Sequence, residues 1–195
     1  MNGRLIYVMK SIWLEPSNRG QRFRRILMFF GWQIWKRAVG TPVQARLCNG
    51  LLTQVWQDCD VTPSALYYSL PNSSALAFLR ERLHGGTFVD VGANVGLVSL
   101  LVADKVKHAI LFEPNPRLVE RARENLRING LRLDVIAAAP SDQAGSIEFE
   151  NATTDASPSR IVEGFTTSKA TISVSRTTFD QFSASCEQRF RRLPE

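Results

Sequence analysis

Short, continuous apolar runs mark the middle of the chain and predict three strands, over residues 87–91, 109–112 and 133–138. Continuous rather than alternating apolar residues are typical of strands that are buried on both faces of a parallel sheet. Between these runs, residues 96–103 and 116–128 have the apolar spacing of helices. The order strand, helix, strand, helix, strand predicts right-handed crossovers and a parallel sheet, so the expected fold class is α/β and Rossmann-like.

The second of these helices carries signals at both of its ends. Asn115 can cap the first turn, and Pro116 suits the first helical position. The pair Asn129-Gly130 can end the helix. We therefore expect a well-defined helix between the second and third strands.

The N-terminal third is patterned differently. Pro16, Asn18 and Gly20 break regular structure, so we expect residues 1–20 to be irregular. Residues 21–38 place apolar residues at helical spacing among arginines and lysines, which predicts a basic amphipathic helix.

A β-hairpin is expected next. Apolar and polar residues alternate over residues 43–47 and 51–56, and the turn dipeptide Asn49-Gly50 lies between them. A helix over residues 74–83 then leads into Gly85-Gly86 and the first buried strand.

The pattern weakens beyond Pro140. Residues 147–149 and 171–175 alternate, which predicts two antiparallel strands joined by the polar loop 151–169. A last helical turn is expected to start near Thr178, and the remaining tail is polar and predicted to fray.

The 195 residues fit one domain plus an appendage. The patterns divide the chain into an irregular basic arm (1–20), an amphipathic helix and hairpin region (21–73), an α/β domain (74–182) and a polar tail (183–195). Three scattered cysteines make no disulfide framework and lack metal-ligand spacing, so we expect reduced thiols, a cytoplasmic protein and no metal site.

The charge is concentrated at the N-terminus. Residues 1–38 hold eight Lys/Arg and one acid, a sum of +7, so the rest of the +6 chain sums to −1. The apolar stretch Ile26–Trp35 is too short to span a membrane, and no signal peptide is expected. We expect the aromatic face of the 21–38 helix to pack on the core, with peripheral membrane contact as the alternative. Its aromatic residues are not interleaved with basic ones as stacking platforms, so no nucleic-acid partner is expected.

The run Asp90-Val91-Gly92-Ala93-Asn94-Val95-Gly96 lies where the first strand turns into a helix. Gly92 removes a side chain where the backbone must approach a ligand, and Gly96 allows the tight turn. Free N–H groups at a helix start favour an anion, such as the methionine carboxylate of S-adenosylmethionine (SAM). Asp90 ends the strand, where it can meet the methionine ammonium.

Glu113 ends the second strand, 23 residues after Asp90. An acidic side chain there can accept hydrogen bonds from both ribose hydroxyls of SAM. Residues 138–142, which include Asp142, follow the third strand and should border the adenine. These groups gather at the carboxyl ends of parallel strands, where open α/β sheets bind ligands. We therefore expect Gly92 and Glu113 to line the same cleft.

Two other interpretations of the glycine run remain open. A dinucleotide-binding oxidoreductase needs the pattern Gly-x-Gly-x-x-Gly, but Asn94 and Leu97 stand at its second and third glycine positions. The glycines could also only shape a turn in a doubly wound domain.

Three blocks of the sequence resemble the FkbM family of methyltransferases. They are Phe88–Gly96, Phe112-Glu113-Pro114-Asn115-Pro116, and Asn125 with Asn129-Gly130. Later blocks of the family resemble two further stretches, residues 137–142 with Gly145 and Thr177-Thr178-Phe179-Asp180. The match therefore covers about residues 75–182.

The resemblance implies a class I SAM-dependent methyltransferase fold and methylation of a hydroxyl on a sugar or a polyketide-like small molecule. It also implies a set of cofactor-binding positions. They are Asp90, Gly92, Asn94, Gly96 and Glu113, with Asn115 near the adenosine. Ala93 in the glycine run and Asp142 after the third strand are further cofactor-binding candidates.

The chain departs from the family after Asp180. The family continues there with a strand that ends in a Lys-x-Asp-x-Glu-Gly-like motif, and residues 180–195 contain nothing similar. We therefore expect a methyltransferase fold that is incomplete, or truncated, at its C-terminal end. The alternative function is a non-catalytic or decayed SAM-binding or interaction protein.

The sequence identifies no catalytic base. His84 and His108 precede strands, so both should lie at the N-terminal edge of the sheet, away from the ligand. Asp142 is better placed, but a loop carboxylate is more often a turn residue. Asp180 is most simply an acid at a helix start.

Overall fold

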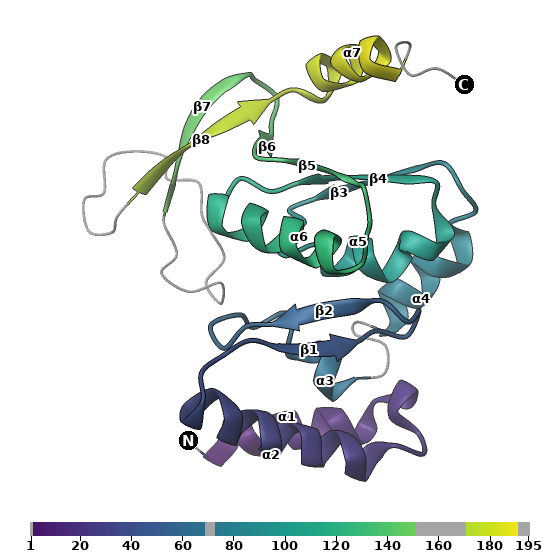
Figure 1. Cartoon of the computed structure of the whole chain (residues 1–195), viewed down its shortest axis with the longest axis vertical. Coiled ribbons are helices and arrows are strands. Elements are labelled where there is room, and N and C mark those ends of the chain that lie inside the picture. Colours follow the sequence, from purple (N-terminus) through teal and green to yellow (C-terminus); the bar gives the residue numbers. More distant parts are fainter. Residues whose placement is uncertain (1, 69–72, 151–170, 191–195) are drawn as a thin grey trace.

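The computed structural model describes residues 2–68, 73–150 and 171–190. Figure 1 shows its elements as stacked layers, with the N-terminal helices at one end and the last helix at the other. The helices are α1 (Asn2–Leu14), η1 (Pro16–Asn18), α2 (Arg22–Ala38), α3 (Ser64–Tyr67), α4 (Ser73–Arg82), α5 (Leu97–Val102), η2 (Ala103–Lys105), α6 (Pro116–Ile128) and α7 (Phe179–Phe190). The strands are β1 (Val43–Arg46), β2 (Leu52–Val55), β3 (Thr87–Val91), β4 (His108–Phe112), β5 (Asp134–Ile136), β6 (Ala139–Pro140), β7 (Gly145–Glu150) and β8 (Thr171–Thr177).

The central unit is a parallel sheet with the strand order β3-β4-β5. Helices α5 and α6 connect the strands and cover one face of the sheet, and α7 lies beyond the other face (Figure 1). The structure therefore confirms the predicted α/β class, the three strands and the two intervening helices. The arrangement is Rossmann-like, with the three described parallel strands forming part of such a sheet.

The predicted cap of α6 at Asn115 and the predicted tight turn at Gly96 before α5 both form. The Asn115 Oδ1 atom accepts a hydrogen bond from the Arg117 backbone N–H at 3.0 Å, which caps α6 behind Pro116. Gly96 lies before α5 with φ of 77°, and a Cβ atom there would come within 3.0 Å of Leu111 Cδ2. Gly96 therefore allows α5 to begin directly against β4.

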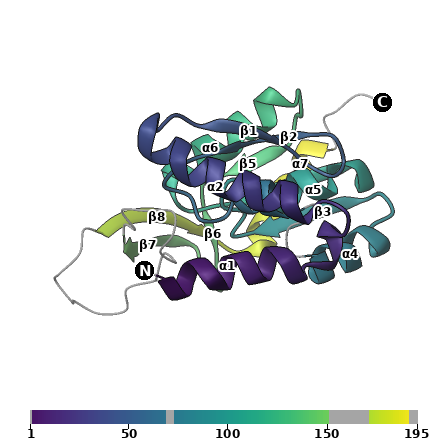
Figure 2. The ribbon, with the colours of Figure 1, turned by 90° about the horizontal axis from the view of Figure 1, so that it is seen from below.

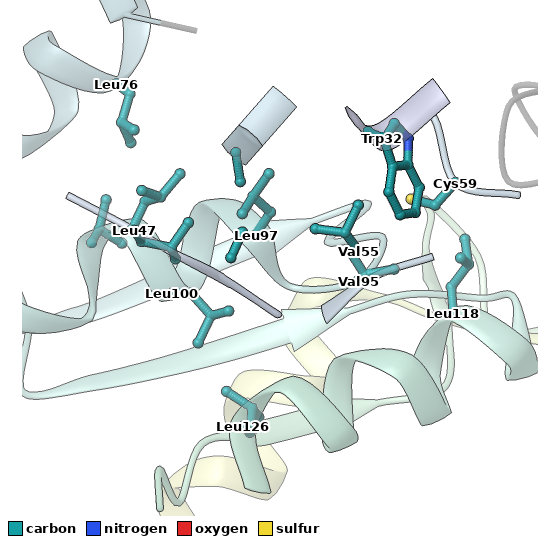
Figure 3. Close-up of a cluster of buried hydrophobic side chains, with 14 residues drawn as sticks. Trp32, Leu47, Val55, Cys59, Leu76, Val95, Leu97, Leu100, Leu118 and Leu126 are labelled. Atoms are coloured by element: carbon teal, nitrogen blue, oxygen red, sulfur yellow. The ribbon is translucent and has the colours of Figure 1, made fainter. Parts of the chain in front are cut away.

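The hairpin β1–β2 is antiparallel, as predicted, and lies on the outer side of α5 and α6. One hydrophobic core joins the hairpin, α2 and these two helices (Figure 3). Its labelled members are Trp32, Leu47, Val55, Cys59, Leu76, Val95, Leu97, Leu100, Leu118 and Leu126. The core thus crosses residue 73, where the sequence patterns divide the N-terminal region from the α/β domain.

Asn125 of α6 and Asn129, which directly follows α6, bind the free side of β2. The buried Asn125 side chain accepts a hydrogen bond from the Gln54 N–H at 2.8 Å, and that of Asn129 accepts one from the Leu52 N–H at 2.7 Å. Asn129 also donates to the Leu52 carbonyl at 2.7 Å. Four helical residues rise about 6 Å and two strand residues about 6.8 Å, so the two side chains match alternate residues of β2.

The expectation of an irregular arm over residues 1–20 is wrong, because α1 is a helix from Asn2 to Leu14. The breakers Pro16 and Asn18 follow this helix rather than interrupt it. Asn18 is buried, and its Nδ2 atom donates to the carbonyls of Ile12 and Tyr67 at 3.0 and 2.9 Å. Burial of Ile12 and these hydrogen bonds fix the end of α1 against the rest of the fold.

The C-terminal region also differs from its prediction. The sequence predicts a polar tail from residue 183, but α7 continues to Phe190. Phe182 anchors this helix, since its ring packs on that of Phe112 in β4 with 4.8 Å between centroids. The predicted loop 151–169 and the end of the tail lie outside the described residues.

The two late strands pair as the alternation predicts. β7 and β8 are antiparallel over Gly145–Glu150 and Thr171–Thr177, and β6 lies parallel to β8 on its other side. They form a second, three-stranded sheet that follows β5 in the chain.

Candidate functional site

The ends of β3 and β4 are joined through the glycine turn, which we define as residues 92–96. The backbone N–H groups of Gly92 and Ala93 both donate to the Phe112 carbonyl at 2.9 Å. The turn therefore lies at the carboxyl edge of the sheet, defined as the edge formed by the C-terminal ends of β3, β4 and β5.

Glu113, the residue after β4, binds this turn. Its Oε2 atom accepts a hydrogen bond from the Asn94 N–H at 2.9 Å, and Oε1 accepts one from the Asn115 N–H at 2.9 Å. The residue is only 5% exposed. Because each carboxylate oxygen can accept two hydrogen bonds, both oxygens keep acceptor capacity for a ligand. Gly92 and Glu113 thus lie at the same sheet edge, as the cofactor hypothesis requires.

The outer side of the turn is open at Gly92. Gly92 has φ of 76°, and apart from its two chain neighbours no residue has a heavy atom within 4 Å of the position that its Cβ would take. The neighbouring Val91 is 61% exposed. A ligand could therefore approach the backbone closely at this position.

The N–H groups of the turn are all engaged within the protein. Besides Gly92, Ala93 and Asn94, the Val95 N–H donates to Asn94 Oδ1 at 2.8 Å and the Gly96 N–H to the Ala93 carbonyl at 2.8 Å. Asn94 adopts a left-handed φ of 53°, a conformation that asparagine tolerates better than most residues. All five N–H groups therefore have an acceptor within the protein.

Asp90 faces helix α5. Its Oδ2 atom accepts a hydrogen bond from the Ser99 hydroxyl at 2.6 Å, and Ser99 is fully buried. Sequence reasoning missed Ser99. Its polar side chain on the buried side of a short apolar helix, nine residues after Asp90, is the signal that could have identified it.

Both carboxylates of this edge have a raised pKa. Burial raises the pKa of Asp90, and hydrogen bonds from Ser99 oppose the shift. Burial also raises the pKa of Glu113, with the nearby negative charge of Asp90 adding to the rise and the N–H groups of Asn115 and Asn94 opposing it. A cationic ligand group would favour the ionised forms, so this edge suits a ligand that carries positive charge.

The side chains of the other predicted residues make no described hydrogen bond to the turn. Asp142 is exposed in the β6–β7 connection, where Oδ1 accepts a hydrogen bond from the Ser141 hydroxyl at 2.9 Å. The side chain of Asn115 caps α6. The structure confirms the N-terminal placement of both histidines, since His84 precedes β3 and the His108 ring lies 3.2 Å from Asp134 at the start of β5. Over the described ranges, no three His, Cys, Asp or Glu side chains gather as a metal site would require.

No family model and no curated protein matches this chain. Among solved structures, it is similar to a tRNA (uracil-54, C5)-methyltransferase from Pyrococcus abyssi, in complex with S-adenosyl-L-homocysteine. The identity is 19%, the TM-score is 0.42, and the match covers 52% of this chain and 24% of that one. A second similar structure is the tRNA m1G37 methyltransferase of M. jannaschii, with 20% identity, a TM-score of 0.36, and coverage of 50% of this chain and 29% of that one. The chain thus spans less than a third of the length of either protein.

Proposed function

We propose that the chain binds SAM at the carboxyl edge of its parallel sheet and belongs to a SAM-dependent methyltransferase. The contact between Glu113 and the glycine turn carries this proposal. Glu113 follows the end of β4 and accepts a hydrogen bond from the Asn94 N–H of the glycine turn at 2.9 Å. The same turn contains Gly92, where a ligand can approach the backbone. The acid and the glycine therefore lie together at the sheet edge where open α/β folds bind ligands.

The described contacts suggest how each part of the cofactor is held. The ribose hydroxyls donate to the remaining acceptor sites of Glu113, and the backbone at Gly92 lies against the ligand. Asp90 attracts the methionine ammonium. Rotation of the Asn94 side chain releases the Val95 N–H, which can then bind the methionine carboxylate. Asp142 and Asn115 border the adenosine in this proposal.

We infer that the methyl acceptor is a hydroxyl group of a sugar or of a polyketide-like small molecule. The sequence blocks that resemble the FkbM family support this substrate class. Methyl transfer requires the acceptor oxygen to lie in line with the sulfonium, and a base or a neighbouring charge to activate the hydroxyl. The protein would supply the first requirement by fixing the cofactor at the strand ends.

A non-catalytic SAM-binding or interaction protein is the second candidate function. One observation favours it: within the described residues, β3 pairs only with β4 and leaves its other side without a strand. A sheet that is incomplete beside the glycine turn could hold the cofactor without enclosing an acceptor.

Calorimetric titration with SAM and with S-adenosylhomocysteine tests the cofactor site. We expect the unmodified chain to bind both, and Glu113→Gln to bind them about tenfold to a hundredfold more weakly, because a charge-assisted hydrogen bond contributes about 1.5–3 kcal/mol. Glu120→Gln is the matched control, since its side chain is 71% exposed on α6, and it should bind normally. Failure of the folded, unmodified chain to bind either compound would overturn the proposal.

Transfer of a radiolabelled methyl group tests the acceptor class. Hydroxyl-bearing sugars and polyketide-like compounds are compared with tRNA as acceptors in the same assay. Label in the small molecules supports the inferred class, and label in tRNA alone contradicts it. Cofactor binding without transfer to any acceptor favours the non-catalytic candidate.

A further inference from the structure

The helical hairpin, defined as α1 and α2, exposes an unusual amount of apolar surface. Figure 2 views the molecule from the side on which these two helices lie. Phe23, Leu27 and Ile34 of α2 are 75%, 70% and 67% exposed, and Ile6 and Tyr7 of α1 are 63% and 73% exposed. Large apolar surfaces that remain exposed commonly mark an interaction site.

Four exposed apolar residues of α2 form one line, the outer stripe, which consists of Phe23, Leu27, Phe30 and Ile34. Their spacing of four, three and four residues places them on one face of the helix. Phe29 and Trp32 lie on the other side of α2 and are only 5% and 4% exposed. The core therefore uses Phe29 and Trp32 of α2, which confirms the predicted packing for these two aromatic residues. The outer stripe makes only edge contacts, of Phe23 with Trp13 and of Phe30 with Phe29, and stays largely exposed.

The apolar surface continues onto α1. The rings of Trp13 and Phe23 meet edge to face with 5.4 Å between centroids. A shallow groove of about 390 Å³ between the two helices is lined by Ile6, Met9, Lys10, Trp13 and Ile26. The helical hairpin thus presents an apolar surface that spans both α1 and α2.

Positive charge surrounds this surface. Residues 1–38 contain eight Lys/Arg and the single acid Glu15. Lys10, Arg24 and Arg37 are exposed, and the Arg22 guanidinium lies 5.3 Å from the Trp13 ring centroid. The combination of apolar, aromatic and basic residues on one surface is that of helices that lie in a membrane interface.

We propose that the helical hairpin docks on an anionic lipid surface. The outer stripe and Trp13 enter the boundary between headgroups and acyl chains, while the basic residues bind lipid phosphates. The helical hairpin lies on the membrane rather than crossing it, because no described helix is both long and apolar enough to span one. Charge opposes a second copy as the partner, since two hairpins of +7 would repel each other. This proposal stands independently of the methyltransferase proposal.

Co-sedimentation with lipid vesicles tests the docking surface. We expect the unmodified chain to bind phosphatidylcholine vesicles that contain phosphatidylglycerol, and to bind pure phosphatidylcholine much more weakly. The double variant Phe23→Ser/Leu27→Ser should reduce binding about tenfold or more, because it removes two inserted side chains. Arg24→Gln/Arg37→Gln should weaken binding to the anionic vesicles only, with a smaller dependence on salt.

Phe78→Ser is the matched control, since Phe78 is 58% exposed on α4 and lies outside the helical hairpin. It should bind vesicles as the unmodified chain does, and circular dichroism should show all variants to be folded. The proposal is overturned by any of three results. These are equal binding by Phe23→Ser/Leu27→Ser, a dimer that this variant abolishes and that excludes vesicles, or binding to tRNA in place of vesicles.

Discussion

Strand β4 and helix α2 are both rich in apolar residues, but the fold treats them in opposite ways. From Ala109 to Phe112, no residue of β4 is more than 4% exposed, whereas Phe23 and Leu27 of α2 are at least 70% exposed. β4 lies between β3 and β5 and between helices on both sides, so each of its side chains meets protein. α2 packs on the core through one face only. Hydrophobicity in the sequence therefore indicates burial only where the topology surrounds the element.

Truncation of a side chain in the α/β core should have the largest effect on stability. Leu100 of α5 is fully buried in the core that α5 shares with α2, the β1–β2 hairpin and α6. We expect Leu100→Ala to lower the free energy of unfolding by about 2–5 kcal/mol, since it removes apolar contacts and leaves a cavity. Urea denaturation measures this loss, and a value below about 1 kcal/mol would mean that α5 is loosely packed.

Loss of the link between α6 and β2 should have the next largest effect. Asn125 accepts from the Gln54 N–H and donates to the Val95 carbonyl, both at 2.8 Å. Asn125→Ala should cost about 1–3 kcal/mol, because it leaves two backbone groups without their partner. Arg127→Ala is the control on the same helix, since the Arg127 side chain is 75% exposed. Equal losses for the two variants would show that the asparagine does not join these elements.

Glu113→Gln should have an effect that depends on pH. The folded protein raises the pKa of Glu113, so the folded state holds the proton more tightly than the unfolded state does. The unmodified chain should then lose stability as the pH rises from the unfolded glutamate value of about 4.3 through the folded value. Glutamine does not ionise, so the stability advantage of the unmodified chain over the variant should shrink across this range. Urea denaturation of both proteins at several pH values measures the difference, and an advantage that grows with pH would contradict the raised pKa.

Truncation in the outer stripe should have the smallest effect on stability. Leu27→Ala removes the same atoms as Leu100→Ala, but from a side chain that is 70% exposed. We expect a change within about 0.5 kcal/mol in the absence of lipid. A loss above about 1 kcal/mol in the same denaturation assay would show that the stripe is packed in solution and would weaken the contrast with β4.

The sequence predicts the α/β unit well because its signals are local. Apolar runs locate β3 and β4, Asn115 and Pro116 locate the start of α6, and the strand-ending position of Glu113 places it beside the glycine turn. Helix α1 escapes prediction because the breakers just after its end make the whole segment look irregular. The partner of each polar group was also beyond prediction. Ser99 donates to Asp90, and the Asn94 N–H donates to Glu113, through contacts between separate elements whose packing the sequence pattern does not give.

The contacts of Asn125 and Asn129 with β2 affect the order in which the chain folds. The hydrogen bonds of Asn125 to Gln54 and of Asn129 to Leu52 join residues that are 71 and 77 positions apart. Closing long loops costs chain entropy before any contact forms, so such pairings tend to form late. The β3–β5 unit, whose contacts join residues closer together in the sequence, should therefore form first. The β1–β2 hairpin should then dock onto α6 after that helix has formed. Loss of the hydrogen bond between Gln54 and Asn125 alone would then accelerate unfolding and leave the folding rate nearly unchanged.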